Sequence, residues 1–315
     1  QMSLTVVKPG LQTTLQSHPR IGMRHLGVPA SGAADPLSLA LANRLVGNAW
    51  DEPALEATLL GPTLRFEAPG VFALAGAQAT PALNGKEVDM HRAVHAAVGD
   101  ELVVGPAMLG ARIYVAIAGG IAVDEILGSA STNLQAGFGG LQGRALAAGD
   151  ELRFSQGAAD TCETPKEFRL PMTSSWAVRT CASVETEQLD ATARERLFGT
   201  NWTISRRADR MGLRLEGPVL NVTSDGRMPS AGVFPGTVQC PEDGVPYLLS
   251  VDAGTVGGYP RIAQVARVDR HLLGQLRPGD HLRLLLRDPD AAVEALHAKL
   301  DYWRDWLPDI DEILL

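Results

Sequence analysis

An acidic and a basic residue stand side by side at Asp209-Arg210, directly before Met211 and Gly212. A guanidinium presents a planar fork of N–H donors that matches a carboxylate or a phosphoryl group. Arg210 is therefore a candidate for binding an anionic group, and Asp209 could orient it or act as a general base. A structural ion pair within a turn would use the same two residues, and both interpretations stay open.

Three further positions combine hydrogen-bonding groups with glycine. Gln239 can both donate to and accept from an amide, which suits an amide substrate. Gly257-Gly258-Tyr259 precedes Pro260, and we include all three as substrate-binding candidates, although an aromatic residue there could equally pack in the core. With Asp209 and Arg210, Gln239 completes the predicted catalytic set.

A second group of candidates follows the glycines of residues 119–143. Ser131 and Thr132 could donate to a carbonyl oxygen, although such residues also cap turns. Arg144 could bind an anion together with nearby backbone N–H groups, or it could brace its loop. The seven histidines are dispersed, and no His-Glu-x-x-His occurs, so we expect no metal site.

Short apolar runs interrupted by Gly and Pro, such as residues 71–75, 113–118 and 247–251, must position these residues. This pattern is typical of an all-β protein with many turns. We expect three helices: one capped by Asp35 and ending at Gly47, one over residues 187–198, and one C-terminal. The last carries an apolar stripe that could pack on the chain itself or on a partner.

A stretch with few apolar residues, 155–172, is predicted to link two β-rich halves at residues 2–155 and 172–286. The C-terminal helix is expected at 288–306. The turn Gly-Asp occurs before an apolar stretch at 99–102, 149–152 and 279–282. Its presence in both halves suggests that each half closes its strands in a similar way.

Composition excludes several classes of protein. The formal net charge is −8, the pI is about 5.4, and the basic residues are scattered, which argues against nucleic-acid binding. No apolar run approaches the ~20 residues of a membrane-spanning helix, and no signal-peptide pattern opens the chain. Three widely spaced cysteines favour a reducing compartment, so we expect a cytoplasmic protein.

Nucleotide and biotin motifs are absent from the sequence. The Gly-Lys pair at 85–86 lacks the first glycine and the hydroxyl of a phosphate-binding loop, and no Gly-x-Ser-x-Gly occurs. Met108 is not followed by the lysine of a biotin-accepting loop. If ATP or carboxybiotin takes part, another chain must bring most of the machinery.

Gly27-Val28-Pro29 through Asp35, Asp209 through Gly212, and Gly257 through Pro260, in this order, resemble one known family. It includes the C-type subunit of 5-oxoprolinase, allophanate hydrolase subunit 2, the KipI antagonists and the carboxyltransferase part of urea carboxylase. The resemblance spans about residues 5–286. It implies a cyclophilin-like β-barrel architecture and a smaller partner subunit of related fold.

The resemblance implies an ATP-dependent 5-oxoprolinase that opens 5-oxoproline to glutamate, together with the smaller subunit of related fold and a homologue of the A-type subunit. Two alternatives remain. The chain could be the carboxyltransferase half of a urea-carboxylase or allophanate system, or a non-catalytic antagonist that binds a kinase inhibitor. The family commonly has polar or charged side chains where this chain has Ala130, Ala253, Gly254 and Val256. These departures favour an altered substrate or a purely regulatory role.

Overall fold

The computed structural model describes residues 2–157, 162–223 and 228–314, which fall into two compact units. Unit 1 lies within Gln1–Arg20, Ser31–Met172 and Trp303–Ile313, and unit 2 within Ile21–Ala30, Thr173–Tyr302 and Leu314–Leu315. The segment Ile21–Ala30 thus belongs to unit 2 although its sequence neighbours belong to unit 1. Of the predicted linker, residues 158–161 lie outside the described residues.

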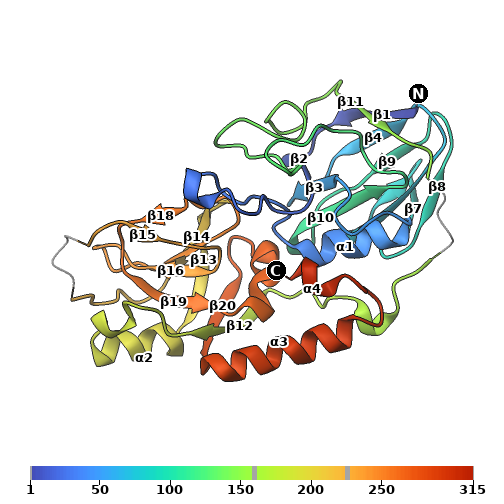
Figure 1. Cartoon of the computed structure of the whole chain (residues 1–315). Coiled ribbons are helices and arrows are strands. Elements are labelled where there is room, and N and C mark those ends of the chain that lie inside the picture. The colour runs from blue at the N-terminus through green and yellow to red at the C-terminus, as the bar shows by residue number, and fades with distance from the viewer. Residues whose placement is uncertain (1, 158–161, 224–227, 315) are drawn as a thin grey trace. The chain divides into compact units, whose positions relative to one another are not determined.

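Unit 1 contains two β-sheets, as Figure 1 shows. The six-stranded sheet has the order β11-β1-β4-β9-β6-β7 and the five-stranded sheet the order β2-β3-β10-β5-β8. The strands are β1 (Met2–Lys8), β2 (Gln12–Gln16), β3 (Ala54–Thr58), β4 (Thr63–Phe66), β5 (Gly70–Gln78), β6 (Ala82–Leu83), β7 (Lys86–Glu87), β8 (Val94–Ala96), β9 (Glu101–Val103), β10 (Leu109–Ile117) and β11 (Glu151–Phe154).

The core of unit 1 forms from inward-facing residues of both sheets, including Leu4, Phe66, Phe72 and Ile113. Helix α1 (Pro36–Leu45) lies against β5 and β10 and is buried along most of its length. Its start is the predicted one, because Asp35 Oδ1 accepts the backbone N–H of Ser38 at 3.0 Å. Helix α4 (Ile310–Ile313) and the 3₁₀ helix η2 (Lys166–Phe168) complete the unit.

Unit 2 is built around a closed barrel with the strand order β12-β19-β16-β17-β14-β13-β20. The pairing of β12 with β20 is parallel, and the other neighbours are antiparallel. A separate two-stranded ribbon consists of β15 and β18. The strands are β12 (Ser175–Cys181), β13 (Asn201–Ala208), β14 (Gly212–Glu216), β15 (Ala231–Gly232), β16 (Thr237–Gln239), β17 (Tyr247–Leu249), β18 (Val256–Gly257), β19 (Arg261–Val265) and β20 (His281–Leu286).

The helices of unit 2 are α2 (Ala191–Gly199), α3 (Pro289–Trp303) and the 3₁₀ helices η1 (Arg24–Leu26), η3 (Thr186–Gln188) and η4 (Arg267–Gln275). The predicted start of α2 at residue 187 is wrong, because Asp190 caps the helix by accepting Ala193 N–H at 2.7 Å. Helix α3 packs on its own unit through Ala292 and Leu296, which contact Ala266 and Val268. Val293, which we assigned to the apolar stripe of this C-terminal helix, is not packed in the same way: it is half exposed.

The three Gly-Asp turns have one geometry in both units. The aspartates at 100, 150 and 280 each accept, through Oδ2, the backbone N–H of the third residue before them. The preceding glycines have φ of +85°, +91° and +88°, a conformation that side chains rarely adopt. Each turn also forms a reciprocal pair of backbone hydrogen bonds with one strand residue, at Phe66, Val6 and Ile204. The predicted similarity of strand closure is confirmed at this level.

The prediction of a mostly β architecture with a closed barrel and few helices is confirmed. The closed barrel is that of unit 2. Across the described ranges, no helix has the length and apolar character needed to cross a membrane.

Candidate functional site

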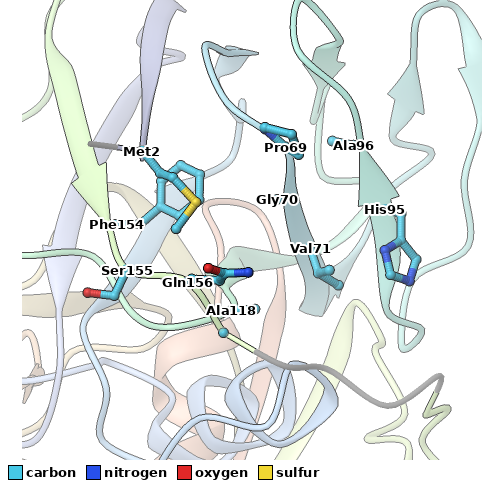
Figure 2. Close-up of a pocket in the computed structure, with 11 residues that line it drawn as sticks. Met2, Pro69, Gly70, Val71, His95, Ala96, Ala118, Phe154, Ser155 and Gln156 are labelled. Atoms are coloured by element: carbon cyan, nitrogen blue, oxygen red, sulfur yellow. The ribbon is translucent and has the colours of Figure 1, made fainter.

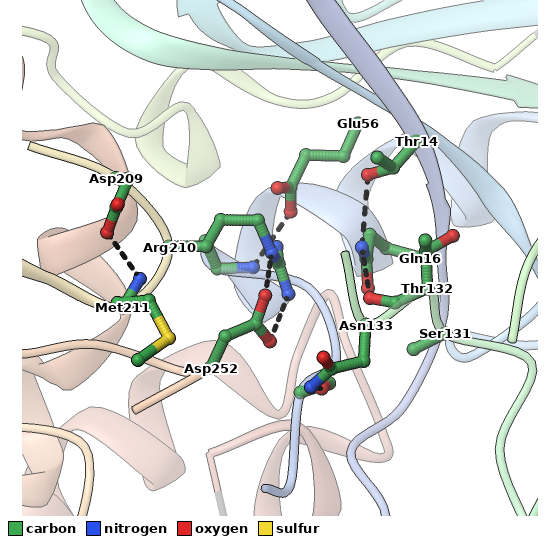
Figure 3. A network of polar contacts seen from close by, with 12 residues as sticks. Thr14, Gln16, Glu56, Ser131, Thr132, Asn133, Asp209, Arg210, Met211 and Asp252 are labelled. Carbon is green, nitrogen blue, oxygen red and sulfur yellow. Dashed lines mark hydrogen bonds and ion pairs between the residues drawn. The ribbon is translucent and has the colours of Figure 1, made fainter. Parts of the chain in front are cut away.

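The Asp209-Arg210 motif forms the turn between β13 and β14. Asp209 is exposed, and its Oδ1 accepts the backbone N–H groups of Met211 (2.7 Å) and Gly212 (3.2 Å). Figure 3 shows Arg210 beside Asp252, with Nε 2.7 Å from Oδ2 and Nη2 3.1 Å from Oδ1. Both side chains are buried, at 4% and 3% exposure. Arg210 therefore binds the side-chain carboxylate of Asp252, a partner that the sequence analysis did not identify.

Gln239 lies on β16 at 7% exposure, and its Nε2 has no hydrogen-bond partner among the described residues. The amide lies against Gly257 of β18, where an added Cβ would come within 2.3 Å of Nε2. Gly257 is thus needed for the close approach of the β15–β18 ribbon to Gln239. Gly258 follows the ribbon, and Tyr259 is half exposed, so the structure places these four predicted residues in one region of unit 2.

Arg24 belongs to the same region and was not predicted. It begins η1, and its Nη2 donates to the backbone oxygen of Val233, which directly follows β15. Its guanidinium lies 5.0 Å from the ring centroid of Phe234. Nη1 is buried and has no hydrogen-bond partner in the described part of the chain, and burial lowers the pKa of Arg24 from its ordinary value. The only sequence signal is a basic residue within the polar segment 20–35.

Ser131 and Thr132 belong to unit 1 and are fully buried. Ser131 Oγ accepts the N–H of Ser17 at 2.9 Å and donates to the oxygen of His18, and Thr132 Oγ1 donates to the oxygen of Leu15 at 2.9 Å. Figure 3 also shows Gln16, whose Nε2 donates to Thr14 Oγ1 and to the oxygen of Thr132. These hydroxyls connect loops within unit 1.

The loop of residues 137–143 crosses directly over Ser131 and Thr132. A Cβ at Gly139 would lie 2.1 Å from the oxygen of Ser131, and one at Gly140 would lie 1.9 Å from Thr132 Oγ1. The loop lines a cavity of about 840 Å³ together with Asp124 and Arg153. Ser131 and Thr132 therefore support a glycine-rich wall rather than face this cavity as lining residues.

Arg144 forms a fork-to-fork pair with Asp150, with Nη1–Oδ2 at 2.7 Å and Nη2–Oδ1 at 2.8 Å. The guanidinium hydrogen bond and the backbone N–H of Ala147 hold the pKa of Asp150 below its ordinary value. Arg144 is 40% exposed on its side chain. The contact with Asp150 braces the Gly-Asp turn at 149–150. Of the two roles considered for Arg144, this is the structural one.

Glu56 is the most buried carboxylate among the described residues of unit 1 after the helix-capping Asp35, at 1% exposure, and it contacts several residues of its own unit. Oε2 accepts from Tyr114 Oη at 2.7 Å and from the N–H of Ala34 at 2.9 Å, and Arg112 Nε lies 3.4 Å from Oε1. Burial, then the charge of Glu56, raises the pKa of Tyr114 well above its ordinary value. The cluster connects β3, β10 and the start of α1.

None of the predicted site residues lines a cavity of about 550 Å³ in unit 1, shown in Figure 2. Met2, Val71 and Phe154 give it an apolar wall, and His95 and Gln156 supply polar groups. Within the described part of the chain, no three histidine, cysteine or carboxylate side chains are grouped as a metal ion would require.

The four family departures lie in different environments. Ala130 and Ala253 are buried, at 2% and 3% exposure, whereas Val256 is 63% exposed at the start of β18. Gly254 lies between Ala253 and the ribbon, and an added Cβ would be in ordinary contact with the oxygen of Val256, at 3.6 Å. Restoring an arginine at 130 or 253 would therefore place a charge in a packed interior, while Val256 can accept a polar side chain.

Comparison with known proteins agrees with this architecture. Residues 26–286 match the family described as carboxyltransferase domain, subdomains A and B. The chain is 36% identical to the C-type subunit of 5-oxoprolinase from Escherichia coli K12, over 96% of each sequence. It is 33% identical to urea amidolyase of Lachancea kluyveri over 92% of this chain, which is 18% of that protein's length.

The crystal structure of Kluyveromyces lactis urea carboxylase superposes with a TM-score of 0.88 and 30% identity, covering 99% of this chain and 29% of that one. Sequence and fold thus agree over nearly the whole chain. This chain belongs to the carboxyltransferase-domain family that includes the C-type subunit of 5-oxoprolinase.

Proposed function

We propose that the chain is the C-type subunit of an ATP-dependent 5-oxoprolinase that opens 5-oxoproline to glutamate. The observation that carries the proposal is the 36% identity to the C-type subunit of Escherichia coli 5-oxoprolinase over 96% of both sequences. The urea enzymes match only over a fraction of their length, 18% and 29%. Because that relative is named as a subunit, we also propose assembly with a smaller subunit of related fold and with a homologue of the A-type subunit.

Opening a lactam requires donors at the carbonyl oxygen and a positioned general base. In this proposal one of the two N–H groups of the Gln239 amide donates to the lactam oxygen, beside the backbone of Gly257 and Gly258, and Tyr259 borders the site. Asp209 supplies the base, because its side chain is exposed and its two hydrogen bonds to Met211 and Gly212 both use Oδ1. Arg210 positions the Asp209 turn through Asp252, whose N–H donates to the Arg210 oxygen at 2.8 Å. Arg144, Ser131 and Thr132 support the glycine loop of unit 1.

ATP acts in the full assembly, and we assign no nucleotide-binding motif to this chain. Biotin is not carried here, since Met108 lacks the following lysine. The three cysteines are free, and burial raises the pKa of Cys240 to about 12, which leaves its thiol protonated. Cysteines that form no disulfide suit the reducing cytoplasm, where we place the assembly.

The test is to co-express the chain with homologues of the smaller subunit of related fold and of the A-type subunit, and to measure ATP-dependent glutamate release from 5-oxoproline. We expect release only from the complete assembly, with at least a ten-fold loss in Gln239→Leu. Gln264→Leu on the neighbouring strand is the matched control, because the Gln264 amide is bonded to Pro235 and Thr237. No release from an intact assembly would refute the proposal.

The carboxyltransferase alternative is favoured by the structural match to urea carboxylase. It predicts urea-dependent loss of the carboxyl group from a carboxybiotin carrier, an activity that avidin would block. The regulatory alternative predicts a stable complex without turnover on either substrate. Val256→Thr then separates the two roles, because restoring a polar group at this exposed position changes turnover in an enzyme but only affinity in a binding protein.

A further inference from the structure

Two buried donors at the β15–β18 ribbon of unit 2 lack acceptors among the described residues: Nη1 of Arg24 and Nε2 of Gln239. An unmade hydrogen bond at a buried polar group costs free energy, and natural proteins rarely leave two in one region. Both groups offer N–H donors, so the missing partner must supply oxygen acceptors.

The charge of Arg24 is also uncompensated. Two other arginines of unit 2 face carboxylates: Arg210 pairs with Asp252, and Arg261 pairs with Glu185. Arg24 makes one hydrogen bond to a backbone oxygen and stacks on Phe234, and it forms no ion pair within the described residues. A partly buried guanidinium without a counter-charge is unfavourable unless an anion joins it.

Both donors lie at the β15–β18 ribbon. Arg24 bonds the backbone of Val233, and the Gln239 amide lies against Gly257, where an added Cβ would be 3.4 Å from Val233 Cγ1. Glu185 is not the acceptor for Arg24 or Gln239, because both of its carboxylate oxygens accept hydrogen bonds from Arg261. Arg261 also donates to the backbone oxygen of Gly232 in the ribbon. The ribbon thus has a surplus of donors.

We propose that Arg24 and Gln239 bind the oxyanion of a small-molecule ligand at the β15–β18 ribbon, and that this group is a carboxylate. A guanidinium with a free donor and a side-chain amide together match two carboxylate oxygens. Phe234 and Tyr259, each about half exposed, offer aromatic surface beside it. The identity of the ligand, unlike the oxyanion site itself, rests on the proposed function. If that function holds, the ligand is 5-oxoproline. A phosphoryl group shares the same acceptor chemistry.

The test is calorimetric titration of the purified chain, and of the assembled complex, with 5-oxoproline, neutral 2-pyrrolidone and inorganic phosphate. We expect 5-oxoproline to bind at least ten-fold more tightly than 2-pyrrolidone, because a charged hydrogen bond is lost with the carboxylate. Arg24→Met should weaken binding by about ten- to a hundred-fold. Arg196→Met is the matched control, since Arg196 also donates to a backbone oxygen, that of Val219, but lies elsewhere in unit 2.

Gln239→Glu sharpens the test. A carboxylate at this position supplies the missing counter-charge, so the variant should unfold at a higher urea concentration while losing oxyanion binding. Tighter binding of phosphate than of 5-oxoproline, still sensitive to Arg24→Met, would keep the oxyanion site and identify a phosphoryl ligand. Equal binding by Arg24→Met and the unaltered protein, in the chain and in the complex, would overturn the proposal.

The two proposals fail separately. Glutamate release by an assembly whose Arg24→Met variant keeps its affinity and its KM would refute the oxyanion site alone. Binding of 5-oxoproline that depends on Arg24, in an assembly that releases no glutamate, would refute the oxoprolinase activity alone.

Discussion

Glu56 in unit 1 and Gln239 in unit 2 are both buried polar side chains on strands, and their surroundings differ. Glu56 accepts from Tyr114 and Ala34 and faces Arg112, so both of its carboxylate oxygens have partners in unit 1. Gln239 and Arg24 each have a buried nitrogen without a hydrogen-bond partner among the described residues, and both side chains lie at the β15–β18 ribbon. A satisfied buried network stabilises a fold, whereas an unsatisfied one indicates where a ligand would bind.

The largest effect should come from breaking the buried ion pair of unit 2. Asp252→Ala leaves Arg210 buried without this carboxylate, and we expect a loss of about 3–5 kcal/mol in the free energy of unfolding. Urea denaturation measures it. The matched variant in unit 1, Asp150→Ala, removes the carboxylate from a pair whose arginine is 40% exposed, and its ion-pair contribution should be at most about 1 kcal/mol. Equal losses would show that burial does not distinguish the two pairs.

A second comparison concerns one buried histidine in each unit. Burial, then Arg169, lowers the pKa of His91 to about 4, and burial, then Lys299, lowers the pKa of His271 well below its ordinary value. Both folded-state values lie below the unfolded value near 6.5, so the unfolded chain binds more protons. Stability should therefore be complete above about pH 6.5 and should fall as the pH drops towards 4, by about 2–3 kcal/mol for His91.

Urea midpoints between pH 7.5 and 4 measure this decline. His91→Asn should reduce it, because asparagine does not titrate in this range and tolerates the φ of +61° found at this position. His281→Asn, at an exposed position of β20, is the control for replacing a histidine by asparagine. A slope unaffected by His91→Asn would contradict the assignment.

The smallest effects test the difference between the surroundings of Glu56 in unit 1 and of Gln239 in unit 2. Tyr114→Phe removes a donor to Glu56 and the acceptor of the Asp35 N–H, so it should destabilise unit 1 by about 1–3 kcal/mol. Gln239→Leu removes an amide whose nitrogen has no partner among the described residues, and we expect a change of less than about 1 kcal/mol, in either direction. Thermal and urea unfolding compare the two. A large loss in Gln239→Leu would mean that Gln239 has a structural role.

Much of the fold was predictable because it depends on local patterns. The apolar runs indicated a β protein, Asp35-Pro36 indicated the start of α1, and the Gly-Asp turns recur with one geometry. The site was less predictable. The chain motif at Asp209 did point to a turn, but the partner of Arg210 lies 42 residues further on, and nothing in the spacing singled out Asp252.

The sequence by itself determined the residue chemistry, the turns and the helix cap, since a glycine at positive φ or an aspartate at a helix start acts on its immediate neighbours. Tertiary structure decided which charges are paired and which donors are left over. Arg24 reaches Val233 across 209 residues of sequence, and Arg144 is taken by Asp150 rather than left for an anion. Only the folded chain fixes these choices, because burial and distance set the free energy of each charge.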